Sequence, residues 1–191
     1  AAAADVARQS TAIVHQASIA LHSRFDDRRL LRQWREWVDE TIAESRRANE
    51  AVIIIDKLNR RLELYHDGLK LAAFHAELGA NGLKQKLHAG DKATPEGRYR
   101  VTQVRANGAT NFYKALLLSY PNSDDVARFR DMQRRGQIPL RAGIGSLIEI
   151  HGSGGQGQDW TDGCVALRDR DMDTLFRHVH VGMPVTIVGT F

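Results

Sequence analysis

The sequence has a single cysteine, Cys164, and no long apolar run among its 191 residues. One cysteine excludes an internal disulfide. A membrane span needs roughly 18 consecutive apolar residues, and no run approaches that length, so no membrane span is expected in this chain. The apolar fraction of 42% and the charged fraction of 26% are ordinary for a globular protein with its own core.

A large excess of charge of one sign is also missing. The 27 lysines and arginines outnumber the 23 aspartates and glutamates by four, so the net charge is +4, and the pI is about 9.5. A basic surface favours anionic partners such as nucleic acid, acidic lipid or cell-wall polymer. The arginines of residues 28–35, however, lie among Asp26, Asp27, Glu36 and Asp39. No basic stripe forms, and no nucleic-acid partner is predicted.

The chain begins with four alanines and Asp5, without an initiator methionine. Such a start is left by cleavage of a signal peptide at small residues, or by cloning. Secretion is therefore permitted by the sequence and not demonstrated by it. In an oxidising compartment an unpaired thiol such as Cys164 would call for an explanation.

Proline and glycine are absent from residues 5–49, which favours helix over this stretch. Apolar residues recur there at helical spacing: Ile13, Ala17, Ala20, Leu21, Leu30, Leu31, Trp34, Trp37, Val38 and Ile42. Ser23 or Asp26 can cap a second helix, so two helices with a break near residues 24–27 are expected. Residues 1–49 are thus predicted to form a helical N-terminal segment. We expect it to dock onto the rest of the chain through Trp34 and Trp37, near the active-site cleft, because exposed apolar stripes are unusual; a face for a partner or a second copy is the alternative.

At residue 51 short β-branched and alternating runs replace the helical spacing. Strands are expected at residues 52–55, 61–65, 69–78, 99–104, 115–119, 147–150 and 185–188, and helices at 123–135 and 168–178. Residues 57–60 form a hairpin loop in this interpretation, and residues 79–97 form a long loop. One mainly β domain over residues 50–191 is predicted.

Two motifs lack the context that their chemistry needs. The glycine-rich run 152–157 does not end in the Lys-Ser/Thr pair of a phosphate-binding loop, so we interpret it as a flexible rim to a site. His178 and His180 share a face if they lie on a strand, but no third metal ligand stands at a suitable spacing. The sequence therefore predicts neither a cofactor nor a metal.

Cys164 is a candidate nucleophile because His151 precedes it by a short interval. A neighbouring imidazole can take the thiol proton and make the reactive thiolate available at neutral pH. A lone cysteine is otherwise often a small buried hydrophobe, so the surrounding residues have to decide between the two interpretations.

Three motifs that follow one another along the chain favour the nucleophile. Residues 90–97 read Gly-Asp-Lys-Ala-Thr-Pro-Glu-Gly, residues 147–152 end an apolar run in His-Gly, and residues 161–164 read Thr-Asp-Gly-Cys. This combination resembles the YkuD-type L,D-transpeptidase catalytic domain of bacterial peptidoglycan enzymes, over about residues 51–191. The resemblance implies a mainly β fold, an L,D-transpeptidase-like β-sandwich with a few helices, here preceded by an α-helical N-terminal segment.

The resemblance also implies roles for individual residues. Cys164 attacks a peptide carbonyl, and His151 takes or shares the thiol proton and later protonates the departing amine. The carbonyl of Gly152 orients the imidazole, where other triads use Asp or Asn. The N–H groups of Gly163 and Cys164 are expected to form the oxyanion hole, and such donors supply about 3 kcal/mol each.

Two positions depart from the family pattern. Asp162 stands where many members have histidine, and Ala166 stands where many have Arg or Asn. A carboxylate aimed at the thiol would raise its pKa, so we expect Asp162 to point away from the sulfur. Trp160 and Arg141 can then supply part of the missing substrate contact, together with Thr161 and Asp162; Trp160 as a plain core aromatic is an equal alternative.

The implied function is a peptidoglycan L,D-transpeptidase that takes a stem tetrapeptide, releases D-alanine and passes the acyl group to an amine on another stem peptide or on a wall-anchored protein. Hydrolysis of the same thioester would make an L,D-carboxypeptidase or an amidase. A non-catalytic wall-binding module and a cysteine protease for ordinary peptides are further alternatives. The resemblance implies a periplasmic or cell-wall location, with the signal peptide removed, and a part in wall biogenesis and cell shape.

Overall fold

The structure is a computed structural model that describes residues 2–106 and 108–191. Its elements in chain order are α1 (Ala2–Phe25), α2 (Arg28–Ala48), β1 (Ala51–Asp56), β2 (Arg61–His66), β3 (Leu69–His75), β4 (Gly97–Arg105), β5 (Ala115–Leu118), α3 (Ser123–Arg134), β6 (Glu149–His151), β7 (Val165–Ala166), α4 (Asp169–Leu175) and β8 (Pro184–Val188). The two N-terminal helices and the break between them agree with the prediction. None of the described helices is both long enough and apolar enough to cross a membrane.

The break between α1 and α2 follows from a side-chain cap. The carboxylate of Asp27 accepts hydrogen bonds from the N–H groups of Arg29 and Leu30, which otherwise have no partner at the start of α2. At the other end Asn49 adopts the left-handed conformation, with φ of 52°, and its N–H bonds to the Ser45 carbonyl. The chain then turns directly into β1.

The eight strands form one sheet in the order β3-β2-β1-β8-β4-β5-β6-β7. The hairpin β1–β2 is antiparallel, whereas β1 with β8 and β6 with β7 are parallel pairs. The sheet curls until its two ends meet, because Glu77 just beyond β3 bridges to Ala166 in β7 and Gly79 bridges to Thr161. The two layers of the predicted sandwich are therefore parts of one curled sheet, and the predicted fold class is confirmed.

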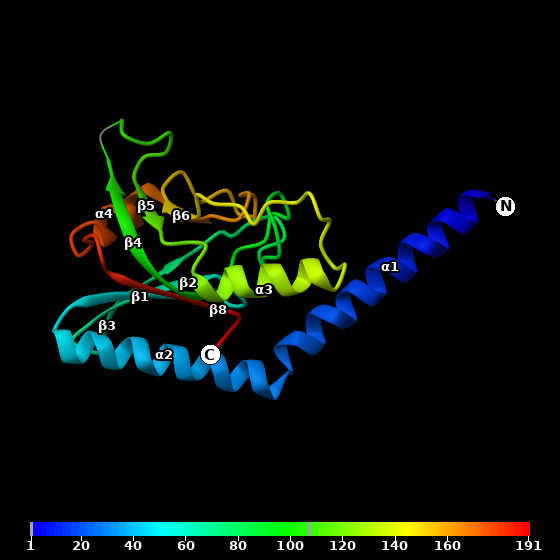
Figure 1. The fold of residues 1–191 in the computed structure, drawn as a ribbon. Coiled ribbons are helices and arrows are strands. Elements are labelled where there is room, and N and C mark those ends of the chain that lie inside the picture. The colour runs from blue at the N-terminus through cyan, green and yellow to red at the C-terminus, as the bar shows by residue number, and fades with distance from the viewer. Residues whose placement is uncertain (1, 107) are drawn as a thin grey trace.

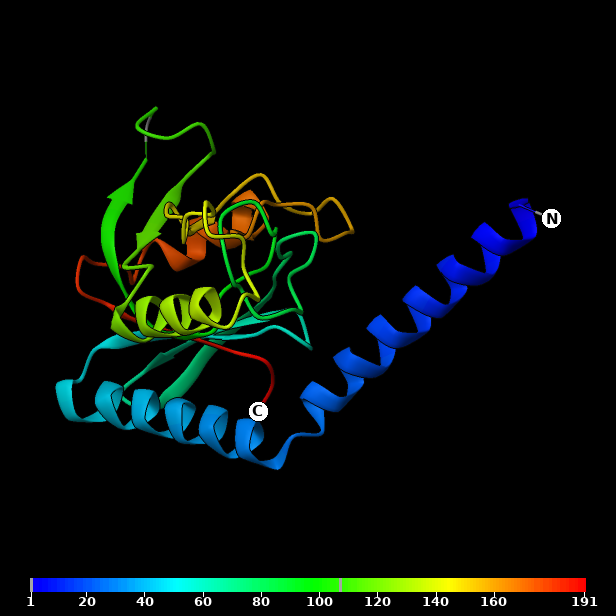
Figure 2. The same cartoon turned by 45° about the vertical axis from the view of Figure 1, so that its right-hand side comes forward.

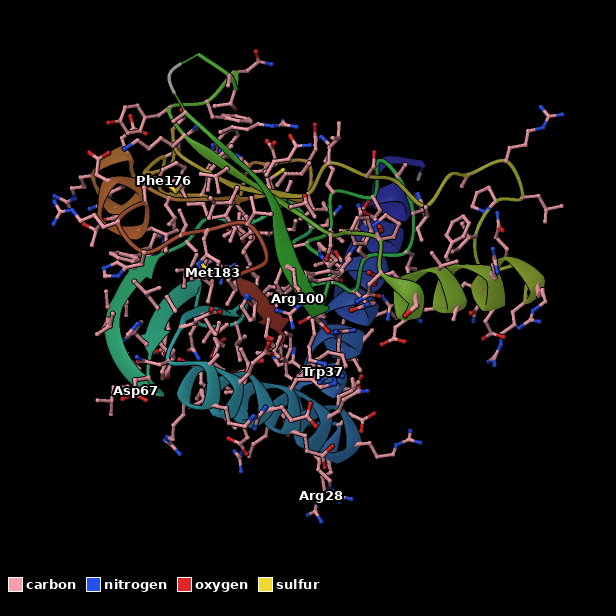
Figure 3. All side chains as sticks on the ribbon, turned by 60° about the vertical axis from the view of Figure 1, so that its left-hand side comes forward. Arg28, Trp37, Asp67, Arg100, Phe176 and Met183 are labelled. Atoms are coloured by element: carbon pink, nitrogen blue, oxygen red, sulfur yellow. The ribbon has the colours of Figure 1, made fainter. Side chains whose placement is uncertain are left out.

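Helix α2 packs on the outer face of β1, β2 and β8, below the sheet in Figure 1. Trp34, 1% exposed, and Val38 enter an apolar cluster with Val52, Ile54 and Val188. Figure 3 shows the contrast along this helix, where Trp37 lies toward the strands and Arg28 points into solvent. Docking through the two tryptophans is thus observed for α2.

The helical segment does not pack over the His-Gly and Cys motifs, although Arg24 at the end of α1 pairs with Glu96 of the motif at residues 90–97. Helix α1 projects away from the body, as Figure 2 shows, and touches it through its last turn, where Phe25 and Arg24 lie against the Trp34 ring. Helix α2 covers β1, β2 and β8, whereas the His-Gly and Cys motifs lie at β6 and β7, at the far end of the strand order. The alternation of apolar residues along β1 decides this, since it buries Val52 and Ile54 on the outer face.

Candidate functional site

The pairing of β6 with β7 brings His151 and Cys164 together. The two short strands run parallel, with Ile150 opposite Val165 and His151 opposite Ala166. Cys164 directly precedes β7 and is thus level with Glu149. Because alternate residues of a strand share a face, Glu149 and His151 point to the same side, opposite to the buried Ile150.

The imidazole of His151 is held by two aromatic rings and at one ring nitrogen. Its Nδ1 lies 2.6 Å from the carbonyl oxygen of Gly152, the contact that the resemblance implied. The Phe112 ring stacks on it at a centroid distance of 3.6 Å, and the Trp160 ring meets it edge-on at 5.8 Å. Burial lowers the pKa of His151 and so favours the neutral ring, which can act as a base.

A side chain at position 152 would collide with its surroundings. A Cβ on Gly152 would lie 2.7 Å from Oδ1 of Asp169 and 2.9 Å from Cβ of Tyr113. Asp169 also accepts a hydrogen bond from the N–H of Ser153 at 2.7 Å. The carbonyl that orients His151 is therefore fixed by tight packing as well as by the strand.

The sulfur of Cys164 is bonded to the backbone of β6 and its approach. The N–H of Glu149 donates to Sγ at 3.4 Å, and the thiol donates to the Leu147 carbonyl at 3.5 Å. Among the described residues no hydrogen bond joins Sγ to the His151 ring. Burial, together with the carboxylates of Glu149 and Asp162, raises the pKa of Cys164 to about 11. The free chain thus holds a neutral thiol beside a neutral imidazole.

This neutral pair predicts slow alkylation of Cys164 at neutral pH. With a pKa of about 11, the thiolate fraction at pH 7 is about 1 in 10⁴. We expect iodoacetamide to modify Cys164 on the order of ten to a hundred times more slowly than a free cysteine peptide, with a rate that keeps rising above pH 9. Mass spectrometry of timed samples measures the alkylation rate and its dependence on pH. Asp162→Asn should speed the reaction, and a rate at pH 7 above that of the peptide would contradict the neutral pair.

The loop before Cys164 is locked by Thr161. This buried residue donates from Oγ1 to the Cys164 carbonyl at 2.7 Å and accepts from the Gly163 N–H at 3.2 Å. Gly163 has φ of +130°, and a Cβ there would lie 2.8 Å from the Ala93 carbonyl oxygen. The Gly163 N–H is therefore engaged within the loop, which corrects the expected pair of oxyanion donors. The N–H of Cys164 has no partner among the residues described and is the donor that stays available.

The other predicted contact residues divide between the site and the surface. Trp160 is half-buried beside His151, and its indole N–H donates to Glu77 at 2.8 Å. Asp162 is exposed and pairs with Lys92 at 3.8 Å; its orientation away from the sulfur stays a prediction. Arg141 is exposed in the loop after α3, and in the described part of the chain no contact joins it to Cys164 or His151. A substrate contact by Thr161, Trp160, Asp162 or Arg141 stays a prediction.

Sequence reasoning missed a groove next to Glu149 and Phe112. It has a volume of about 370 Å³ and is lined by residues 108–112 together with Arg105, Leu147 and Glu149. Arg105 pairs with Glu149 at 2.9 Å. The alternation of Glu149 and His151 on one strand could have placed Glu149 at the site, but no local signal marks Phe112 or Arg105. Within the described residues no three His, Cys, Asp or Glu side chains gather as a metal site.

Residues 50–187 match the model of the YkuD family, the L,D-transpeptidase catalytic domain. This match covers more than two thirds of the chain. The chain belongs to the YkuD family. The family resemblance of the three motifs is thus confirmed, although no curated protein matches the chain.

Solved structures share the YkuD fold with this chain at low sequence identity. Bd1075 of Bdellovibrio bacteriovorus has a TM-score of 0.54 at 22% identity, with 75% of this chain and 50% of that one covered. The helical cell shape determining protein Pgp2 of Campylobacter jejuni has a TM-score of 0.54 at 21% identity, covering 74% and 48%. An L,D-transpeptidase of Stackebrandtia nassauensis has a TM-score of 0.50 at 13% identity, covering 74% and 56%. The chain spans about half the length of these proteins.

The first YkuD motif lies beneath the nucleophile loop and braces it. Thr94 accepts the N–H of Gly79 at 3.0 Å, and its carbonyl accepts from the buried ammonium of Lys57 at 2.7 Å. Lys57 also pairs with Glu96 at 2.9 Å. Because the Ala93 carbonyl packs on Gly163, this turn fixes the position of the loop that carries Cys164. The motif is therefore a support for the nucleophile.

Proposed function

We propose that this chain is a peptidoglycan L,D-transpeptidase in which Cys164 is the acyl carrier. The observation that carries the proposal is the pairing of β6 with β7, which sets a lone thiol beside an imidazole held by the Gly152 carbonyl. In a YkuD domain this arrangement supports a thioester with a stem tetrapeptide and release of D-alanine. A periplasmic or cell-wall location is part of the proposal.

The first half-reaction forms the thioester. His151 takes the thiol proton as Sγ attacks the peptide carbonyl, so the S–C bond forms and the carbonyl oxygen gains negative charge. In this proposal the N–H of Cys164 donates to that oxygen. The C–N bond then breaks, and the protonated imidazole returns its proton to the leaving amine of D-alanine. Atoms and charge balance without a metal or an external base.

The geometry supports proton transfer only after substrate binds. In the free chain the thiol donates to the Leu147 carbonyl at 3.5 Å. A bound peptide that displaces this contact frees the thiol proton for His151. Since both groups are neutral, binding does not have to break an ion pair. A neutral resting thiol would also protect Cys164 from oxidation, because the thiolate is the susceptible form.

Incubation with a disaccharide-tetrapeptide tests the proposal. A cross-linked dimer, with a transient mass adduct on Cys164, is the expected result. If tripeptide is the sole product, the chain is an L,D-carboxypeptidase and not a transpeptidase. If the folded chain forms no adduct with the tetrapeptide or with a carbapenem, the proposed enzymatic activity is wrong. That result would favour a wall-binding module.

We also propose the division of the chain into a helical segment, residues 1–49, and a catalytic domain, residues 50–191. The left-handed Asn49 that ends α2 and the start of the family match at residue 50 support this boundary. The buried face of α2 supports a structural role for the helical segment. A part in cell shape would follow from the wall cross-links that the enzyme forms.

A further inference from the structure

Arg24, in the last turn of α1, reaches the support beneath the nucleophile loop, residues 161–164. Its guanidinium pairs with the carboxylate of Glu96, which is 4% exposed, and lies over the Trp34 ring at 5.5 Å. Glu96 belongs to the first YkuD motif, whereas α1 lies outside residues 50–187, the part of the chain that matches the family model. The rest of α1 projects away from the body (Figure 2). One side chain of the helical segment therefore enters the catalytic domain at a motif of the site.

Glu96 joins Arg24 to a second cation, the fully buried Lys57. The Lys57 ammonium donates to Oε1 of Glu96 at 2.9 Å. It also donates to the carbonyl oxygens of Thr94 at 2.7 Å and of Lys84 at 2.8 Å, so all three of its protons are used. Burial lowers the pKa of Lys57 and the charge of Glu96 opposes that shift. The charged ammonium, and with it the grip on the Thr94 carbonyl, therefore depends on this carboxylate.

Thr94 carries this arrangement to the nucleophile loop. Its Oγ1 accepts the N–H of Gly79 at 3.0 Å, and Gly79 bridges to Thr161. The backbones of Gly79 and Gly163 are in close contact, since a Cβ on Gly79 would lie 2.9 Å from Cα of Gly163. Thr161 in turn donates to the carbonyl of Cys164 at 2.7 Å. A series of packed, hydrogen-bonded groups thus leads from the ion network to the nucleophile.

Stability alone does not favour the network of Arg24, Glu96 and Lys57. Burying an ion pair costs the hydration of both charges, and apolar replacements are often no less stable. Nε of Arg24 is also buried without a hydrogen-bond partner among the residues described, which adds to the cost. Charged hydrogen bonds do supply direction, because they hold their groups in one arrangement. The network is therefore better suited to fixing the motif in place than to stabilising the fold.

We infer that Arg24 is a positioning residue for the reaction: through Glu96 it holds the nucleophile loop in the arrangement in which Cys164 forms its thioester. The inference rests on the proposed function, since it concerns the same half-reaction. It goes further because it gives the helical segment, which lies outside the family match, a part in the chemistry. In the described structure Arg24 acts at a distance, through the contacts above, and touches neither reacting group.

A double-mutant cycle on the full chain tests the inference. Arg24→Gln is expected to slow thioester formation at saturating disaccharide-tetrapeptide by about five- to tenfold, because the nucleophile is held less well. The half-saturating concentration should stay within about twofold, since no substrate contact is lost. Arg24→Lys keeps the positive charge and should restore at least about half of the rate. In a chain that carries Glu96→Gln, the further change Arg24→Gln should have no effect, because its partner is gone.

Arg28→Gln is the matched control. Arg28 begins α2, on the other side of the break between the two helices, and points into solvent (Figure 3). The substitution removes the same charge from the helical segment without touching the ion network. Its rate of thioester formation should stay within about twofold of that of the unaltered chain. An equal loss in Arg28→Gln and Arg24→Gln would assign the effect to net charge and contradict the inference.

Amide hydrogen exchange gives a readout that needs no catalysis. In Arg24→Gln the N–H of Gly79, bonded to Thr94, and the N–H of Gly163, bonded to Thr161, should exchange faster by at least about fivefold. The amides of the paired strands β1 and β2 should exchange at an unchanged rate. A loss of global stability would speed both sets, so the comparison separates local positioning from destabilisation. This arm also decides the case if Glu96→Gln does not fold.

The outcomes separate the inference from the function on which it rests. If the unaltered chain forms a thioester and Arg24→Gln forms it equally fast, the inference is wrong and the proposed function stands. A slowing that persists in full beside Glu96→Gln, or faster exchange in β1 and β2 as well, also overturns the positioning role. Absence of any thioester in the unaltered chain overturns the proposed function, and the inference with it.

Discussion

Replacing Cys164 by alanine removes the mass adduct with tetrapeptide and lowers turnover by at least about 10³-fold. The physical reason is that the acyl group has no other carrier, since this is the one cysteine of the chain. The fold should persist, because Sγ contributes two long backbone contacts. We expect the free energy of unfolding to change by less than about 1 kcal/mol. Intact-protein mass spectrometry and urea unfolding measure the two effects.

His151→Gln is the companion variant for this prediction. It keeps the thiol and removes the base, so alkylation of Cys164 should continue at high pH while acylation by tetrapeptide fails. An adduct that survives Cys164→Ala would place the nucleophile elsewhere. Normal acylation in His151→Gln would show that the thiol loses its proton without the imidazole.

Replacing Trp34 by alanine destabilises the protein by about 3–5 kcal/mol, the range for removing a fully buried large aromatic side chain. The ring fills the space between α2 and the strands, against Val38, Ile54 and Val188. It also receives the Phe25 ring at 5.9 Å and the Arg24 guanidinium at 5.5 Å. Urea unfolding followed by far-UV circular dichroism measures the loss.

Trp37→Ala is the matched control, since Trp37 lies on the same helix and is only partly buried. Its cost should be clearly smaller than that of Trp34→Ala. Equal costs would mean that helix propensity, and not burial, sets the effect. A cost below about 1 kcal/mol for Trp34→Ala would mean that α2 is not part of the cooperatively folded unit.

Local chemistry accounts for the elements that were predicted well. The alternation of residues 61–65 and the β-branched run of residues 52–55 are strand patterns that tertiary packing had no reason to override. Where prediction failed, a contact distant in sequence intervened. The expected strand at 147–150 starts only at Glu149, because Leu147 has φ of 58°, which no strand residue adopts. The expected strand at 69–78 ends at His75, because Glu77 leaves β2 and pairs with Ala166.

The sequence by itself determined the family and the pair of residues that the proposed chemistry needs. Cys164 and His151 stand within motifs whose order and spacing identify a YkuD domain, and a lone thiol cannot form an internal disulfide. The lock of Thr161 on Gly163 was also within reach of sequence, since glycine there meets the demand of a positive φ.

Only the tertiary structure decided the pKa values of Cys164 and His151 and formed the groove next to Glu149. The pKa of Cys164 depends on burial and on Glu149, a residue brought level with it by the register of β6 and β7. The groove needs Arg105 at the end of β4, Phe112 from the following loop and Glu149 from β6 to line one hollow. Electrostatic energies and packing act through space, and no local pattern encodes which distant strands become neighbours in a curled sheet.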